Sequence, residues 1–157
     1  MVLSAGLLLY RVVDGDVQVW IAHMGGPFWK RRPRAWSIPK GLYTEEERPL
    51  DAARREFEEE IGVSAPDLDY LLLGAFRQSS GKIVTVFAGA GGHDVRFVAS
   101  TTFELEWPRG SGVVREYPEI EAARWMSAAE ARSGIVAGQL PILDALEAGL
   151  SSGSPSA

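Results

Sequence analysis

The chain has 157 residues, a length that fits one domain with a full hydrophobic core, and its 46% apolar and 24% charged residues are typical of a soluble globular protein. It contains no cysteine, which excludes disulfides, thiolate metal sites and a cysteine nucleophile, and which fits a cytoplasmic protein. The formal net charge of −5 argues against general nucleic-acid binding, because such binding needs a basic surface to neutralise phosphates.

Two antiparallel strands are predicted at the N-terminus. Residues 3–12 and 16–23 are rich in aliphatic and aromatic side chains, and Asp14-Gly15 between them is a strong signal for a hairpin turn. The apolar run within the first strand is too short for a membrane span or a signal peptide. We therefore expect a hairpin and no membrane partner.

A cationic loop follows the hairpin. Between residues 25 and 34 the chain has four cations in five positions, namely Lys30, Arg31, Arg32 and Arg34. One interpretation is a solvated loop that offsets negative charge elsewhere. The other is a clamp in which Arg31, Arg32 and Arg34 bind a polyphosphate, because a guanidinium holds two oxygens at once.

A helix is predicted between Pro49 and Gly62, because proline suits the first turn of a helix and glycine suits its end. Apolar residues recur between them with the spacing of one buried helix face, at Leu50, Ala53, Phe57 and Ile61. We expect this face to pack against the core.

Three carboxylates share one side of the predicted helix. They belong to Glu56, Glu59 and Glu60, whereas Glu58 projects elsewhere. Like charges at these spacings repel, so the arrangement costs stability unless a cation lies among them. A hard divalent cation would supply that charge, and an oxygen-only site favours Mg²⁺ or Mn²⁺ over Zn²⁺. The alternative is an ordinary solvated acidic face.

The second half of the chain alternates strand and turn signals before two helices. Strands are predicted at residues 68–78, 82–90, 102–107 and 119–125, helices after Ser127 and at residues 140–148, and a disordered tail at residues 151–157. Strands on both sides of a central helix indicate a single α/β domain over residues 1–150, with a mixed sheet covered on both faces.

Residues 41–63 resemble a known motif. Gly41, Glu47 and the run Arg55-Glu56-Phe57-Glu58-Glu59-Glu60-Ile61-Gly62-Val63 match every fixed position of the Nudix box, G-x5-E-x7-R-E-U-x-E-E-x-G-U, where U is a bulky aliphatic residue. The one departure is Phe57, where the family usually has Ile, Leu or Val. The wider chain looks like bacterial Nudix proteins predicted to be NTP pyrophosphohydrolases. The segment WSIPKG at residues 36–41, which leads into the motif, is similar to the corresponding segment of dinucleoside-polyphosphate hydrolases. The resemblance implies the Nudix fold, an α/β/α sandwich.

The resemblance also implies roles for single residues. Glu59 and Glu60 would be metal ligands, and Glu56 would be the general base or a further ligand. The backbone carbonyl of Lys40 would complete the metal shell, and its ammonium could touch phosphate. The structural positions of the box would be Gly41, Glu47, Arg55 and Gly62, with the glutamate and the arginine forming an ion pair that holds the loop against the helix.

Later residues are candidates for completing the site. Many Nudix enzymes add a carboxylate from a later loop, and Glu119 stands where related sequences place theirs, with Glu116 as the second choice. For either residue the alternative is an ordinary exposed glutamate. Tyr43, Trp107 and Tyr117 could stack on a nucleotide base, although each could instead belong to the core or to the rim of a site.

The expected function is a Mg²⁺-dependent hydrolase that cleaves a nucleoside diphosphate linked to another moiety by attack of water on phosphorus. The WSIPKG segment and the cationic loop favour a dinucleoside polyphosphate, such as diadenosine tetraphosphate, as the substrate. A nucleoside triphosphate is the next choice. A different hypothesis is a non-catalytic Nudix-fold module that binds a nucleotide or a regulator. Such relatives commonly lose box glutamates, and this chain keeps them all.

Overall fold

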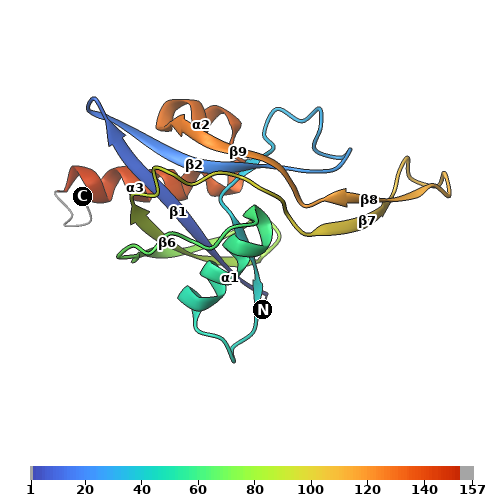
Figure 1. The fold of residues 1–157 in the computed structure, drawn as a ribbon, viewed down its shortest axis with the longest axis horizontal. Coiled ribbons are helices and arrows are strands. Elements are labelled where there is room, and N and C mark those ends of the chain that lie inside the picture. Colours follow the sequence, from blue (N-terminus) through green and yellow to red (C-terminus); the bar gives the residue numbers. More distant parts are fainter. Residues whose placement is uncertain (1, 153–157) are drawn as a thin grey trace.

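A computed structural model describes residues 2–152 of the chain (Figure 1). Within these residues, seven strands form one mixed sheet and two form a separate hairpin, and no helix is long and apolar enough to cross a membrane. In chain order the elements are β1 (Leu3–Val13), β2 (Asp16–Met24), β3 (Trp36–Ser37), β4 (Lys40–Tyr43), α1 (Pro49–Ile61), β5 (Leu71–Arg77), β6 (Ile83–Ala90), β7 (Thr102–Glu106), β8 (Val114–Pro118), β9 (Ile120–Ser127), α2 (Ala128–Gly134), the 3-10 helix η1 (Ala137–Gln139) and α3 (Leu140–Ser151).

The strand β1 lies at the centre of the mixed sheet. It pairs with β2 and β4 in antiparallel and with β6 in parallel orientation, and β5 continues the sheet beyond β6. On the other side, β2 also pairs with β3 and β9. Because β1 is buried on both faces, it needs a nearly continuous apolar sequence, which its middle residues provide.

Two hydrophobic cores lie on opposite faces of this sheet. Leu7 and Leu9 of β1 pack on the face covered by α1, together with Phe57 of that helix. Leu8 and Tyr10 pack on the other face, which α2 and α3 cover (Figure 1). Successive side chains of a strand point to opposite faces, so one apolar run supplies both cores. The fold is the predicted α/β/α sandwich.

Most regular elements were predicted, with small shifts at their ends. The first hairpin turns at Asp14 and Gly15, whose φ angles of 51° and 82° are the left-handed values that this turn requires. The central helix is α1 as predicted, and its Leu50 is only partly buried. Ser127 caps α2, because its side chain accepts a hydrogen bond from the backbone N–H of Glu130.

Three short strands were not predicted. β3 and β4 flank Pro39, which has no N–H for a sheet hydrogen bond, and β8 has too few apolar side chains to show a period of two. The strand predicted at residues 68–78 begins at Leu71. The disordered tail was predicted to begin at residue 151, but Ser151 is the last residue of α3. Residues 153–157 of that tail lie outside the described part of the chain.

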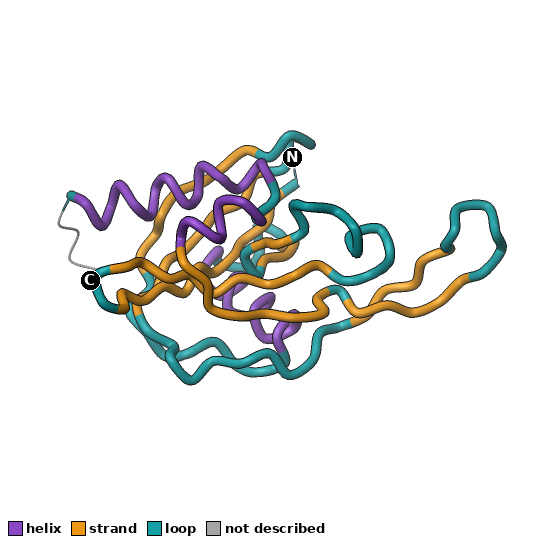
Figure 2. The backbone as a smooth tube through the Cα atoms, turned by 90° about the horizontal axis from the view of Figure 1, so that it is seen from above, coloured by secondary structure: helices purple, strands orange, loops and turns teal. Residues whose placement is uncertain are grey.

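The hairpin of β7 and β8 projects from the body of the molecule (Figures 1 and 2). The two glutamates of β7 are exposed, and Phe103 and Leu105 are half-buried. At the base of the hairpin, Gly25 lies so close to Pro118 that a Cβ atom on the glycine would overlap the proline carbonyl. The hairpin base and the loop after β2 therefore pack together as one wall.

Candidate functional site

A cavity of about 240 Å³ lies where α1, the entry to β4 and the base of the β7–β8 hairpin meet. Lys40, Glu60 and Glu119 contribute charged groups to its lining, and Trp29 and Phe103 contribute aromatic rings. The wall is completed by Met24, Gly25, Ser37 and Ile120. A concave site that combines charged groups with aromatic rings suits a ligand that carries both phosphates and a flat ring.

Lys40 and Glu60 form the half-buried polar centre of the cavity. The backbone N–H of Lys40 donates a hydrogen bond to Glu60 Oε1 at 3.2 Å. Burial raises the pKa of Glu60 to about 8, against the opposing effect of the Lys40 ammonium, and burial lowers the pKa of Lys40. The charges of Glu56 and Glu119 act on both groups. Glu116, by contrast, is exposed on β8, so the structure places Glu119 at the cavity.

Arg55 is the cation that the other box glutamates share. Its Nε and Nη2 donate to the two carboxylate oxygens of Glu47 at 2.9 Å each, which is the predicted ion pair. Its Nη1 donates to Glu56 Oε1 at 2.9 Å and to both oxygens of Glu59 at 3.2 Å. The hydrogen bonds from Arg55 lower the pKa of Glu47, whereas burial raises the pKa of Glu56.

Two cations of the chain itself partly offset the repulsion among the box glutamates. Arg55 contacts Glu56 and Glu59, and the Lys40 ammonium acts on Glu60. In the arrangement of residues 2–152, no three or more His, Cys, Asp or Glu side chains converge closely enough to hold a metal ion. Glu59, which the sequence predicts to be a metal ligand, is hydrogen-bonded to Arg55 in this arrangement.

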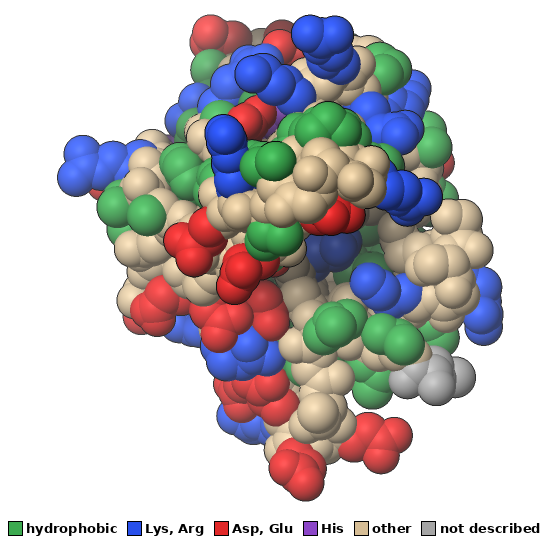
Figure 3. Space-filling model, turned by 90° about the vertical axis from the view of Figure 1, so that its right-hand side faces the viewer, with side chains coloured by type: hydrophobic (Ala, Val, Ile, Leu, Met, Phe, Trp, Pro, Cys, Tyr) green, Lys and Arg blue, Asp and Glu red, His purple; other side chains and the backbone are tan. Residues whose placement is uncertain are grey.

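The donor set fits a hard divalent cation. The candidate side chains are all carboxylates, the ligand type that Mg²⁺ and Mn²⁺ prefer. Burial penalises the ionised forms of Glu56 and Glu60, and a bound cation would relieve that penalty. On the face seen in Figure 3, acidic side chains gather in the lower half with basic side chains between them, so the acids do not form a uniform negative surface.

The two box glycines are needed for different reasons. A Cβ atom on Gly41 would overlap the carboxylate of Glu56, so the missing side chain makes room for that group. Gly62 ends α1 with a φ angle of 91°, and a Cβ atom there would lie 2.6 Å from the carbonyl oxygen of Ala99. Gly41 therefore makes room for the Glu56 carboxylate, and Gly62 allows α1 to end.

The cationic loop is not a uniform clamp. Arg31 and Arg32 are exposed, and the guanidinium of Arg32 lies over the Phe28 ring at 3.9 Å from its centroid. Arg34 donates to two backbone carbonyls at the end of α2, at 2.8 and 2.9 Å. Because its guanidinium already ties the loop to α2, we leave Arg34 out of the phosphate-binding set.

The aromatic residues predicted to stack on a base do not line the cavity. Tyr43 packs with the core on the α1 side of the sheet. Trp107 follows the outer end of β7 and is 39% exposed. Tyr117 contacts Phe103 with 6.1 Å between ring centroids, so it lies behind the ring that faces the cavity. The stacking roles of these three residues stay predictions.

Three residues around the cavity were missed by sequence reasoning. Trp29 and Phe103 line it, and the positive charge of Lys82, just before β6, acts on the ammonium of Lys40. A sequence signal existed for Trp29, which directly precedes the cationic run. Nothing in the local sequence links Lys82 to Lys40, because their charges interact only through the pairing of both segments with β1.

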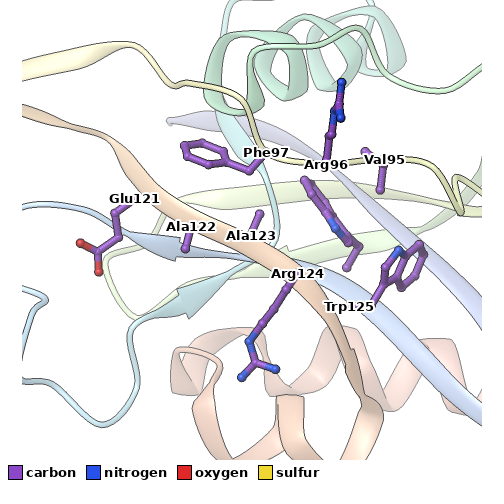
Figure 4. Close-up of a pocket in the computed structure, with 9 residues that line it drawn as sticks. Val95, Arg96, Phe97, Glu121, Ala122, Ala123, Arg124 and Trp125 are labelled. Atoms are coloured by element: carbon purple, nitrogen blue, oxygen red, sulfur yellow. The ribbon is translucent and has the colours of Figure 1, made fainter.

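A larger and more open hollow of about 450 Å³ lies between β9 and residues 95–97 (Figure 4). Two of its charged side chains already have partners. Glu121 contacts His23 at 2.7 Å, and Arg124 contacts Glu130 at 2.9 Å and points away from residues 95–97 in Figure 4. The hollow contains none of the predicted site residues, so we assign the functional site to the smaller cavity beside the box.

The family model described as the NUDIX domain matches residues 3–146 of this chain. The chain belongs to the Nudix family. Nudix proteins are typically pyrophosphohydrolases and typically use divalent metals. No curated protein matches the sequence.

Solved structures of Nudix proteins share the fold. A C. elegans Ap4A hydrolase in a binary complex has 21% identity and a TM-score of 0.66, over 97% of this chain and 99% of that one. The M. smegmatis Nudix hydrolase RenU has 18% identity and a TM-score of 0.65, over 95% and 85%. The NUDIX domain of Shewanella oneidensis NrtR, complexed with ADP ribose, has 13% identity and a TM-score of 0.60, over 96% and 88%. At such identities the likeness concerns the fold alone.

Proposed function

We propose that this Nudix protein is a Mg²⁺- or Mn²⁺-dependent pyrophosphohydrolase that cleaves a nucleoside diphosphate linked to another moiety by attack of water on phosphorus. One observation carries the proposal, namely the cavity beside the box. It combines Glu60 and Glu119, Lys40, and the aromatic ring of Trp29. Those are the groups that a metal ion, a phosphate and a nucleobase each need.

Different residues would serve metal binding and proton transfer. Glu59, Glu60 and Glu119 would hold the ion, with the carbonyl of Lys40 as a further oxygen. When bound, the ion polarises phosphate oxygens and lowers the pKa of a coordinated water. Glu56 would be the base or a further ligand. Its side chain is only 13% exposed and burial raises its pKa, so it accepts a proton more readily than an exposed carboxylate does.

The preferred substrate is a dinucleoside polyphosphate such as diadenosine tetraphosphate, with a nucleoside triphosphate as the next choice. Lys40 gives positive charge at the cavity, and Arg31 and Arg32 extend it onto the exposed loop. A long polyphosphate would use both groups of cations, because each contact neutralises a different phosphate. One structure that shares the fold is an Ap4A hydrolase and another is complexed with ADP ribose, so the test includes both compounds.

The test is hydrolysis of a nucleotide panel with and without Mg²⁺, with the products identified by mass to show which phosphorus–oxygen bond breaks. The panel should contain diadenosine tetraphosphate, nucleoside triphosphates, ADP-ribose and a nucleoside monophosphate as the control without an anhydride bond. Metal-dependent cleavage of an anhydride is the expected result. Tight nucleotide binding without any turnover would instead support the non-catalytic binding module.

Trp29 is expected to bind the nucleobase, so Trp29→Ala should raise the KM for a nucleotide about tenfold while kcat changes by less than about twofold. Stacking of a base on an aromatic ring contributes about 1–3 kcal/mol, and its loss weakens ground-state binding. Steady-state kinetics with a nucleotide and with inorganic tripolyphosphate, which has no base, measure the effect. Trp29→Phe is the matched control and should keep most of the affinity. Equal KM changes for both substrates would exclude a contact with the base.

Binding of Mg²⁺ at pH 7 is expected to release protons. Burial raises the pKa of Glu60 to about 8, so this carboxyl is largely protonated at pH 7 in the metal-free protein and must ionise to bind a cation. Affinity should therefore rise with pH up to about 8. Titration calorimetry in buffers with different ionisation enthalpies measures the released protons, and Glu60→Gln removes this release. A binding enthalpy independent of the buffer would contradict the assignment.

A further inference from the structure

Gln139 is the most deeply buried polar side chain near the candidate site, yet it lies outside the box and outside the cavity lining. It is 0% exposed and ends η1, the short turn before α3. Glutamine is seldom fully buried unless its amide is hydrogen-bonded, because an unpaired buried amide costs about 1–3 kcal/mol. Its partners therefore show what holds it there.

Both ends of the Gln139 amide bind the segment that enters β4. Its Oε1 accepts from the backbone N–H of Ile38 at 3.0 Å, and its Nε2 donates to Ser37 Oγ at 2.9 Å. The Ser37 hydroxyl in turn donates to the carbonyl of Ile38 at 2.8 Å, which closes the network. An amide supplies the donor and the acceptor together, so no apolar side chain of similar size can replace it.

This network ends two residues before Lys40. Between Ile38 and Lys40 stands Pro39, whose ring fixes φ and whose carbonyl accepts from the backbone N–H of Leu7 in β1 at 3.1 Å. Lys40 then donates its own N–H to Glu60. The backbone from Ile38 through Pro39 to Lys40 thus connects the Gln139 network to the carboxylate of Glu60, and the bond from Pro39 to β1 fixes the middle of that connection.

We propose that Gln139 is a positioning residue that holds the backbone of Lys40 in place and thereby aims the carboxylate of Glu60. The proposal rests on the proposed function, because it assigns that carboxylate to metal binding. Loss of a group that orients a metal ligand by hydrogen bonds typically lowers metal affinity or activity by about 10–100-fold.

The test compares Gln139→Met with Gln78→Met. Methionine keeps the volume of glutamine but removes both hydrogen bonds. Gln78 is the matched control. Its Nε2 donates to the carbonyl of Gly138 at 3.3 Å and so supports the same turn, and within residues 2–152 it makes no hydrogen bond to residues 36–40. Mn²⁺ affinity, measured by the paramagnetic signal of free Mn²⁺, should fall about tenfold or more in the Gln139 variant and stay within about twofold in the control.

Amide hydrogen exchange supplies a readout that needs neither metal nor substrate. In Gln139→Met the amides of Ile38 and Lys40 should exchange faster, while amides in the centre of β1 keep their rates. In Gln78→Met the Ile38 and Lys40 rates should be unchanged. If Gln139→Met does not fold, Ser37→Ala tests the same proposal. It removes the two hydrogen bonds of the Ser37 hydroxyl, and the amide of Ile38 should then exchange faster.

The outcomes separate this inference from the proposed function. Equal Mn²⁺ affinity and equal exchange in wild type and Gln139→Met overturn the positioning role, whatever the enzyme hydrolyses. The same changes in Gln78→Met also overturn it, because they would follow from loosening the turn alone. A wild type that binds Mn²⁺ but cleaves no anhydride refutes the proposed function and leaves the positioning role standing.

Discussion

Glu60→Gln is expected to lower kcat about a thousandfold without destabilising the metal-free protein. The substitution removes a carboxylate that would hold the ion, and loss of a metal-based stabilisation of several kcal/mol corresponds to a rate factor of about 10³. The Gln side chain keeps an oxygen that can accept from the N–H of Lys40, so the local structure should persist. Steady-state kinetics with saturating Mg²⁺ measure the loss.

The expected effect of this substitution on stability follows from the raised pKa of Glu60. Burial raises the pKa of Glu60 from 4.5 to about 8, so its contribution to stability is complete below pH 4.5 and is lost as the pH rises through 8. Glutamine does not ionise in this range. Metal-free Glu60→Gln should therefore match or exceed the stability of the wild type at pH 8, and the difference should shrink at pH 6. Thermal unfolding at the two pH values measures it.

Glu58→Gln is the matched control for this experiment. Glu58 lies on the same helix, but it accepts a hydrogen bond from Ser64 Oγ at 3.2 Å and does not line the cavity. Its replacement should change kcat by less than about twofold, as expected for a surface substitution away from the site. Equal activity of Glu60→Gln and the wild type would remove Glu60 from the metal site.

The helix and its acidic side could be predicted from the sequence because their signals are local. Pro49 and Gly62 mark the helix ends, and the spacing of Phe57 and Ile61 follows the helix period. The structure has the same boundaries and buries Ala53, Phe57 and Ile61 as predicted, whereas Leu50 is only partly buried. The central sheet followed from apolar runs and the turn at Asp14-Gly15 for the same reason. Local periodicity thus determined the elements, and the two-sided burial of β1 determined the layers.

The partners of the charged residues could not be predicted, because they depend on pairing between distant strands. Arg34 looked like part of a phosphate clamp, and only the position of α2 shows that its guanidinium is already bonded. Lys82 reaches Lys40 through the pairing of β6 and β4 with β1. Trp29 faces the cavity because the loop after β2 packs on the β7–β8 hairpin, whose partner strand β8 has no clear sequence period.

Gly41→Ala is expected to lower kcat about a hundredfold while the free energy of unfolding changes by less than about 1 kcal/mol. The added Cβ atom would overlap the carboxylate of Glu56, which is the far end of a flexible side chain and can move aside. The fold then survives, but the proposed base is displaced, and a displacement of about 1 Å can cost about 10² in rate. Kinetics and denaturant unfolding of the same preparation measure the two quantities.

Gly62→Ala makes the opposite prediction and is therefore the control for Gly41→Ala. At Gly62 the φ angle of 91° disfavours any side chain by about 1–2 kcal/mol, and the new Cβ atom would meet the backbone of Ala99, which cannot rotate away. This variant should lose stability and keep kcat per folded molecule. If Gly41→Ala instead lost stability and kept its kcat, the room beside Glu56 would serve the fold, and the assignment of Glu56 to the reaction would lose its structural support.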